Sequence, residues 1–83
     1  MTLTKGNVIV ENIKVGDIHF EYDHGSCLKV EVLEVPTKDS EGNFEWKAKV
    51  VSTGEIVDYF VNPKYQHYSP NLYDYEAYER KVL

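Results

Sequence analysis

The sequence predicts a mainly β protein, namely a small antiparallel β-barrel followed by a short C-terminal helix or helical turn. Apolar and polar side chains alternate with period two over most of the chain up to residue 62, as in strands with one buried face. Glycine-containing turns separate the alternating runs, and no helical period precedes residue 62. Because 83 residues can enclose only one hydrophobic core, we expect a single domain spanning 1–83, with the barrel over roughly 7–62 and a tyrosine-rich segment over 63–83.

The first strands of the barrel are predicted before residue 24. Residues 7–13 begin the sheet, and the Gly-Asp pair within 14–17 indicates a turn before the first long strand. In the run 18–23 larger apolar side chains alternate with polar ones, which predicts one buried face. The side chains predicted for that face are Ile18, Phe20 and Tyr22.

The run Cys27–Val35 predicts a second long strand, which Pro36 ends. Its inward side chains are predicted to be Leu28, Val30 and Val32. Leu33 and Val35 depart from this alternation, and we interpret them as a bulge or twist that changes the inward face.

Two further strands follow a predicted hairpin tip at Glu41–Asn43, so the second and third long strands are expected to pair antiparallel. The inward side chains of the third strand are predicted to be Phe44, Trp46, Ala48 and Val50. A turn at Ser52–Glu55 leads to the last long strand, Ile56–Val61, on which either face fits the core. Of its two faces, we expect the inner one to carry Val57, Tyr59 and Val61.

Short strands joined by short turns indicate a barrel of about four or five strands, best described as SH3-like. Within it, the order of Val15–Asp17, Trp46–Val50, Gly54–Glu55 and Val57–Tyr59 resembles the Tudor branch of SH3-like barrels, over roughly residues 13–62. The resemblance implies a reader of methylated lysine or arginine, in which aromatic rings surround a cation. The rings available for such a pocket are Tyr22, Trp46, Tyr59 and Phe60.

Two features weigh against that aromatic pocket. Trp46 lies on an alternating face that a hydrophobic core explains more simply. Where Tudor cages commonly continue from Asp-Tyr into a Gly-Asn turn, this chain has Asp58–Val61, which continues as a strand. We therefore expect Trp46 in the core, and a small-ligand or methylated-residue reader is the alternative function.

The layout of the whole chain, including His67–Pro70 followed by Leu72 and Tyr73, also resembles small uncharacterised proteins encoded by tailed bacteriophages. This resemblance implies an accessory protein in the cytoplasm of an infected bacterium, where it would bind, and could inhibit, a host or defence protein. A single cysteine, Cys27, forms no internal disulfide, which also favours the cytoplasm. No apolar run is long enough for a signal peptide or a membrane span, so no membrane is expected as a partner.

Five of the seven tyrosines lie between residues 65 and 78. Ser69 followed by Pro70 predicts a helical turn in this segment, and Asp74 offers a second helix start. An apolar stripe at helical spacing predicts that the helix packs on the barrel through Leu72, Tyr75, Tyr78 and Val82.

The tyrosines outside that stripe predict a partner-binding surface. Tyrosine is enriched in protein interfaces because its ring offers a large rigid surface with a polar tip. Together with flanking carboxylates, the predicted contact residues are Tyr65, Tyr68, Tyr73, Asp74, Glu76 and Glu79. A net charge of -5 and a pI near 5.0 favour a basic protein surface and disfavour nucleic acid as the partner.

Neither metal binding nor catalysis is predicted. Potential metal ligands lie close together in sequence at Asp17, His19, Asp23 and His24. A zinc site would need a further ligand such as His67, and the spacing matches no established closed site, so we interpret these side chains as solvated surface. Cys27 beside a histidine would be a nucleophile only with a lowered thiol pKa, and a buried thiol is the simpler expectation. We therefore predict a non-catalytic protein without a cofactor.

Overall fold

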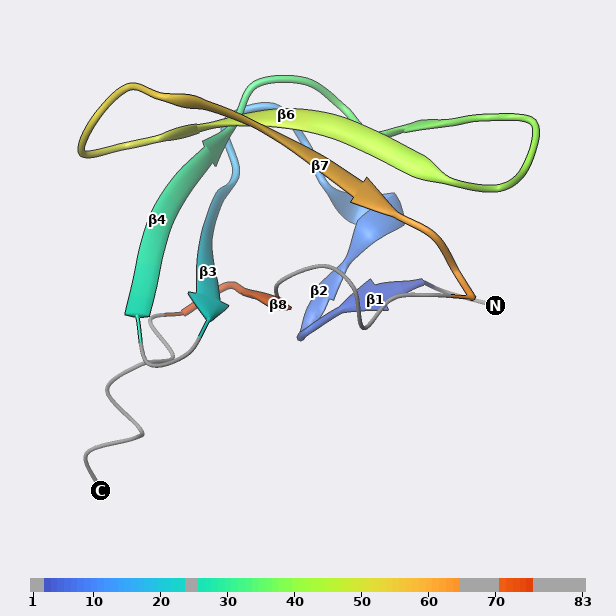
Figure 1. The fold of residues 1–83 in the computed structure, drawn as a ribbon, viewed down its shortest axis with the longest axis horizontal. Helices are drawn as coiled ribbons and strands as arrows, with labels where there is room; N and C mark the ends of the chain where they lie inside the picture. Colours follow the sequence, from blue (N-terminus) through green and yellow to red (C-terminus); the bar gives the residue numbers. More distant parts are fainter. Residues whose placement is uncertain (1–2, 24–25, 65–70, 76–83) are drawn as a thin grey trace.

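The computed structural model describes residues 3–23, 26–64 and 71–75. Apart from one 3-10 turn, every regular element in these ranges is a β-strand, and all paired strands are antiparallel. Six strands form one sheet, which curls into a half-barrel above a separate two-stranded hairpin (Figure 1). The predicted mainly β, antiparallel architecture is confirmed.

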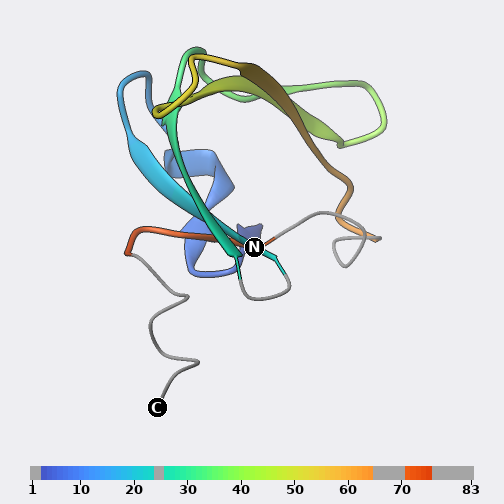
Figure 2. The ribbon, with the colours of Figure 1, turned by 60° about the vertical axis from the view of Figure 1, so that its left-hand side comes forward.

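The strands of the large sheet are β3 (Ile18–Asp23), β4 (Ser26–Val32), β5 (Thr37–Lys38), β6 (Phe44–Val50), β7 (Ile56–Val61) and β8 (Asn71–Tyr73). Across the sheet, β7 pairs with β6, β6 with both β4 and β5, β4 with β3, and β3 with β8. The predicted antiparallel pairing of the second and third long strands, β4 and β6, is confirmed. Figure 2 shows the arch of this sheet from another side, with the N-terminal hairpin beneath its concave face.

The concave face of the half-barrel carries the hydrophobic core. Opposite residues in an antiparallel ladder point to the same face, and pairs such as Val30 and Val50 therefore join neighbouring strands into one inner surface. Burial of each such side chain stabilises the fold by about 1.5–3 kcal/mol. The predicted inner faces of β6 and β7 are confirmed, with Phe44 and Val57 partly buried and the others buried, namely Trp46, Ala48, Val50, Tyr59 and Val61.

The inner face predicted for β3 is wrong. His19 lies opposite the buried Val30 in the ladder between β3 and β4, and its own side chain is only 5% exposed. The alternation then places Ile18, Phe20 and Tyr22 on the outer face. Ile18 is exposed there, whereas the two rings are partly buried. The register with β4, which lies later in the chain, therefore decides which face of β3 is inside.

Two details of β4 also differ from the prediction. Leu28 is 42% exposed, and it lies outside the segment 30–32 in which β4 pairs with β6. The predicted bulge at Leu33 is absent, since the Leu33 amide donates to the Lys47 carbonyl oxygen at 2.8 Å, as in a regular ladder. The alternation of inner and outer side chains is therefore unbroken here, and it places Leu33 on the outer face. Leu33 and Val35 are both exposed as a result.

The N-terminal segment forms a small hairpin beneath the half-barrel. It consists of β1 (Thr4–Lys5), β2 (Val8–Ile9) and the 3-10 turn η1 (Val10–Asn12). The amide of Val10 donates to the carbonyl oxygen of Leu3 at 2.9 Å, which holds η1 against the start of the chain. The hairpin closes one side of the core with the buried side chains Leu3, Val8, Val10 and Ile13.

The described part of the C-terminal segment is a strand where a helix was predicted. Asn71–Tyr73 is β8, and Leu72 pairs with Glu21 of β3 and is fully buried, so a helix continuing from Ser69–Pro70 is wrong at these three residues. The rest of the predicted stripe beyond Tyr75 lies outside the described residues. In the described ranges there is no helix long and apolar enough to cross a membrane.

Candidate functional site

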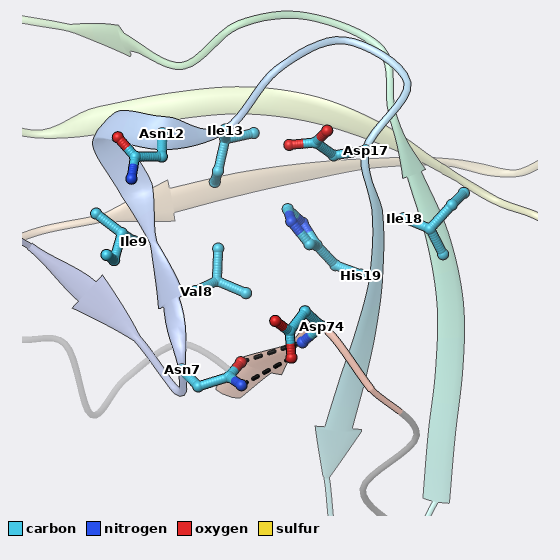
Figure 3. A pocket seen from close by; sticks show the side chains of 9 residues that line it. All are labelled: Asn7, Val8, Ile9, Asn12, Ile13, Asp17, Ile18, His19 and Asp74. Carbon is cyan, nitrogen blue, oxygen red and sulfur yellow. Dashed lines mark hydrogen bonds between the residues drawn. The ribbon is translucent and has the colours of Figure 1, made fainter.

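A pocket of about 350 Å³ lies between the N-terminal hairpin and the first long strand (Figure 3). Its walls come from the hairpin, from the turn before β3, from β3 itself and from the residue after β8. The lining residues are Asn7, Val8, Ile9, Asn12, Ile13, Asp17, Ile18, His19 and Asp74. Segments from both ends of the described chain therefore meet at this pocket.

The turn between β1 and β2 holds the hairpin against β8. Gly6 has a φ of +65°, and a Cβ atom there would overlap the carbonyl oxygen of Leu72. The next residue, Asn7, donates from its backbone amide to that same oxygen at 3.2 Å. Its side chain donates to Asp74 Oδ1 at 2.8 Å and accepts from the Asp74 amide at 3.1 Å. These contacts fix the Asp74 carboxylate at the edge of the pocket.

A second carboxylate is positioned by the turn at residues 14–17, which confirms the turn predicted there. The backbone amide of Lys14 donates to Asp17 Oδ2 at 2.9 Å, and the Asp17 amide donates to the Lys14 carbonyl oxygen at 3.1 Å. Gly16 within this turn has a φ of +93°, a conformation that favours glycine. Asp17 is therefore held at the start of β3, two residues before His19, and lines the pocket with it.

His19 is the buried polar group of the pocket. Its imidazole points into the pocket, with Asp17 on one side and Asp74 on the other in Figure 3. Its Nδ1 atom is buried and has no hydrogen-bond partner among the described residues. Burial lowers the pKa of His19, and the charges of Asp17 and Asp74 partly oppose this by raising it. Burial therefore favours the neutral imidazole, and the interpretation of His19 as solvated surface is wrong because its side chain is buried.

The metal ligands considered from the sequence are only partly brought together. Asp17 and His19 share the pocket, whereas His24 and His67 lie outside the described residues. The described part of the chain contains no group of three histidine, cysteine, aspartate or glutamate side chains close enough to hold a metal ion. Cys27, expected to be buried, is partly buried on the outer face of β4 opposite Tyr22.

The predicted tyrosine-rich surface is described only in part. Tyr65, Tyr68, Glu76 and Glu79 lie outside the described residues, and Tyr73 and Asp74 lie within them. Tyr73 is opposite Phe20 on the outer face of β8 and β3, and its ring lies 5.4 Å from that of Tyr75. Tyr75, assigned to the packed stripe by the sequence, is 36% exposed. The described end of the chain thus presents two adjoining tyrosine rings, and the exposed residue Asp74 lies between these tyrosines in the sequence.

The four aromatic residues of the alternative pocket do not share one face of the sheet. Trp46 and Tyr59 are buried on the inner face, where their rings stack with centroids 5.4 Å apart. Tyr59 donates a hydrogen bond to the Glu21 carboxylate, and burial, followed by this bond, raises the pKa of its hydroxyl. Tyr22 and Phe60 belong to the outer face. The expectation that Trp46 lies in the core is confirmed.

A match to a known family would allow its functional residues to be compared with those of this chain. Within the described residues, the two candidate binding sites are the His19 pocket and the surface formed by Tyr73, Asp74 and Tyr75. Comparisons of the chain with protein-family models, with curated proteins and with solved structures find no match.

Proposed function

We propose that the chain is a non-catalytic protein-binding module that engages a basic protein surface through its tyrosine-rich C-terminal segment. The contact residues of the proposal are Tyr65, Tyr68, Tyr73, Asp74, Glu76 and Glu79. The observation that carries it is the pair of adjoining rings at Tyr73 and Tyr75 with the exposed Asp74 carboxylate between them in the chain. Large rigid rings beside a negative charge suit a partner surface that carries lysine or arginine.

The outer face of β3 extends this aromatic surface. Phe20 and Tyr22 are partly buried, and they pair in register with Tyr73 and Asn71 of β8. Tyr73 therefore stands on a sheet, where its ring loses little entropy on binding compared with a ring on a long flexible side chain. A rigid aromatic surface of this kind provides the anchor residues of an interface.

The resemblances of the sequence suggest the setting in which the module would act. We propose that the half-barrel is an SH3-like, Tudor-like barrel and that the chain after Tyr75 adds a short helix. Following the resemblance to tailed-bacteriophage proteins, the partner would be a host or defence protein in the bacterial cytoplasm, which binding would inhibit. The net charge of -5 supports a basic partner, because opposite charges speed encounter and orient the two surfaces.

A second candidate function, binding of a small ligand, is favoured by one observation. The buried Nδ1 of His19 lacks a partner among the described residues and lies in a pocket of about 350 Å³. Pockets of this size with a few convergent polar groups are typical of ligand sites. The His19 pocket supports this function better than the aromatic set does, because Trp46 is only 1% exposed.

Affinity capture from bacterial lysate tests the protein-binding function. Tagged wild type is compared with a Tyr65→Ala, Tyr68→Ala, Tyr73→Ala variant, and with Phe60→Ala as the matched control. Phe60 is an outer-face aromatic on β7, and three strands separate β7 from β8 in the sheet. All baits are first shown to be folded by circular dichroism.

The expected result is one protein that wild type and Phe60→Ala retain and the triple variant loses. Its release should be promoted by salt, because screening weakens attraction between exposed charges. Equal retention by the triple variant would contradict the proposed surface, and retention of nothing specific by wild type would favour the small-ligand function.

A further inference from the structure

The polar groups around His19 match one class of ligand, and we propose that this pocket binds a guanidinium group. If the chain engages a basic protein surface as proposed above, an arginine side chain of that partner is the group that the pocket receives. Asp74 belongs to both places, because it is one of the proposed contact residues and also lines the pocket. Asp74 directly follows Tyr73 in the chain, so the proposed partner surface and the pocket meet at this residue.

The buried imidazole is the feature of the pocket that points to a polar ligand. A buried polar atom without a hydrogen bond costs about 1–3 kcal/mol, so native structures rarely leave one unpaired. His19 Nδ1 has no partner among the described residues, although the side chain is only 5% exposed and points into the pocket (Figure 3). With its proton on Nε2, the neutral imidazole offers Nδ1 as an acceptor. A ligand that donates a hydrogen bond there would satisfy it.

The two carboxylates give the pocket a negative potential. Asp17 uses Oδ2 to accept from the Lys14 amide, and Asp74 uses Oδ1 to accept from Asn7. No hydrogen bond within the described residues involves the other oxygen of either carboxylate. None of the residues that line the pocket is lysine or arginine. The pocket therefore offers more hydrogen-bond acceptors than donors and carries negative charge. An anionic ligand would be repelled, and a cationic ligand is favoured.

The spread of the acceptors favours guanidinium over a more compact cation. In Figure 3, Asp17 and Asp74 lie on opposite sides of the His19 ring. No three ligating side chains among the described residues are close enough to hold one metal ion. A guanidinium carries five N–H donors around a planar group, so it reaches separated acceptors that a point charge cannot contact at once.

The remaining walls suit the apolar stem of an arginine side chain. Val8 and Ile13 are buried, Ile9 is partly buried, and Ile18 is exposed at the start of β3. Arginine commonly lays its methylene groups along apolar surface while its charged head makes polar contacts. The pocket thus combines an apolar wall with carboxylates near its edges and an acceptor in its interior.

Small probes test the pocket without the partner. Ethylguanidinium, ethylammonium and the neutral ethylurea are titrated at constant ionic strength into isotope-labelled protein, and NMR follows the backbone amides and the His19 imidazole nitrogens. Ethylguanidinium should give saturable shifts at His19 Nδ1, with an affinity at least about tenfold higher than that of ethylurea. Equal affinity for ethylammonium would overturn the choice of guanidinium.

Charge-removing variants keep the local hydrogen bonds. In Asp17→Asn and Asp74→Asn the amide oxygen can still accept from the Lys14 amide and from Asn7, so each variant removes the charge alone. Each should weaken ethylguanidinium binding by roughly tenfold, and Asp58→Asn, on the outer face of β7, should leave it unchanged. Unaltered binding in both pocket variants would overturn the site. These outcomes do not depend on the tyrosine surface, so a failed pocket and a failed protein-binding function are distinguishable.

Discussion

At the scale of single residues, Gly6 has the most demanding position in the described chain. Its positive φ is adopted readily by glycine only, and the space where a side chain would begin is occupied by backbone of β8. Backbone atoms cannot move aside as a flexible side chain would. The contact between the N-terminal hairpin and β8, and with it the pocket beside His19, therefore requires glycine at position 6.

Replacement of Gly6 by alanine should destabilise the protein more than the same change at Gly16. Both residues have positive φ, which costs alanine about 1–2 kcal/mol, but only Gly6 is in close contact, since nothing lies within 4 Å of a Cβ at Gly16. Overpacking adds about 1–3 kcal/mol at Gly6. Urea denaturation of both variants measures the difference, and equal losses of stability would show that the hairpin and β8 are not in close contact.

The burial of His19 predicts a pH dependence of stability. Its folded pKa is lowered by burial, so the unfolded chain binds a proton more readily. The free energy of unfolding should therefore fall as the pH is lowered through the unfolded value of about 6.5, until the lower folded pKa is reached. Above that window, where both states are neutral, His19 should contribute no pH dependence.

Urea denaturation at several pH values between about 7.5 and 5 tests this, with His19→Gln as the reference. Glutamine does not titrate, so the slope of stability against pH should be smaller in the variant. The charges of Asp17 and Asp74 favour protonated His19 and limit the size of the effect. A wild-type stability that rises as the pH falls through this window, relative to the variant, would contradict a buried neutral imidazole.

The sequence predicts some residues of the site and not others for a physical reason. The turn that positions Asp17 is local, so the Gly-Asp pair was sufficient to find it. The inward orientation of His19 depends on its register with Val30, and hydrophobic alternation alone favours the opposite face of β3. Asp74 contacts Asn7, which lies 67 positions earlier in the chain, and a local sequence pattern cannot predict a contact over that separation.

At the scale of elements, β8 connects the tyrosine-rich segment to the half-barrel. It is three residues long and contributes one fully buried side chain, Leu72, whose backbone pairs with β3 and contacts Gly6 and Asn7 of the N-terminal hairpin. A strand this short has little stability of its own, because most of its free energy comes from packing against its neighbours. The position of Tyr73 and Asp74 thus depends on Leu72.

Leu72→Ala should destabilise the protein by about 2–5 kcal/mol, as expected for a buried leucine that leaves a cavity. Asn71→Ala is the matched control on the same strand, and because Asn71 is exposed, it should change stability by no more than about 0.5 kcal/mol. Chemical denaturation followed by Trp46 fluorescence compares the two. Similar small effects of both changes would show that β8 is not packed in the core.

The strands that were predicted correctly pair with neighbours close in the sequence, whereas the strand that was predicted incorrectly pairs with a distant one. The faces of β6 and β7 were predicted because both strands alternate strongly and are joined by the tight turn at 51–55, so local pattern and pairing agree. In β8, helical spacing from Leu72 competed with strand pairing to Glu21 far earlier in the chain. Tertiary pairing prevailed over the local pattern, as it often does in short segments.

At the scale of the whole molecule, the two ends of the curled sheet carry different kinds of side chains. At one end β6 and β7 carry the outer-face pair formed by Lys47 and Asp58, an exposed ion pair that adds little stability. At the other end β3 and β8 carry the aromatic surface and, with the hairpin, the acidic pocket. If the chain binds a basic partner as proposed, exposed negative charge near the aromatic rings at that end would favour one direction of approach.

Association with the partner should therefore depend on salt mainly through the association rate. Raising the ionic strength from about 0.1 to 1 M shortens the Debye length from about 10 to 3 Å, which removes long-range attraction but affects close contacts less. Surface plasmon resonance with the captured partner measures both rate constants.

Asp74→Asn should reduce the association rate at low salt more than Asp58→Asn, although both remove one negative charge, because Asp74 lies within the proposed interface. Equal effects of the two changes would mean that net charge alone attracts the partner, and an association rate independent of salt would contradict a basic partner surface.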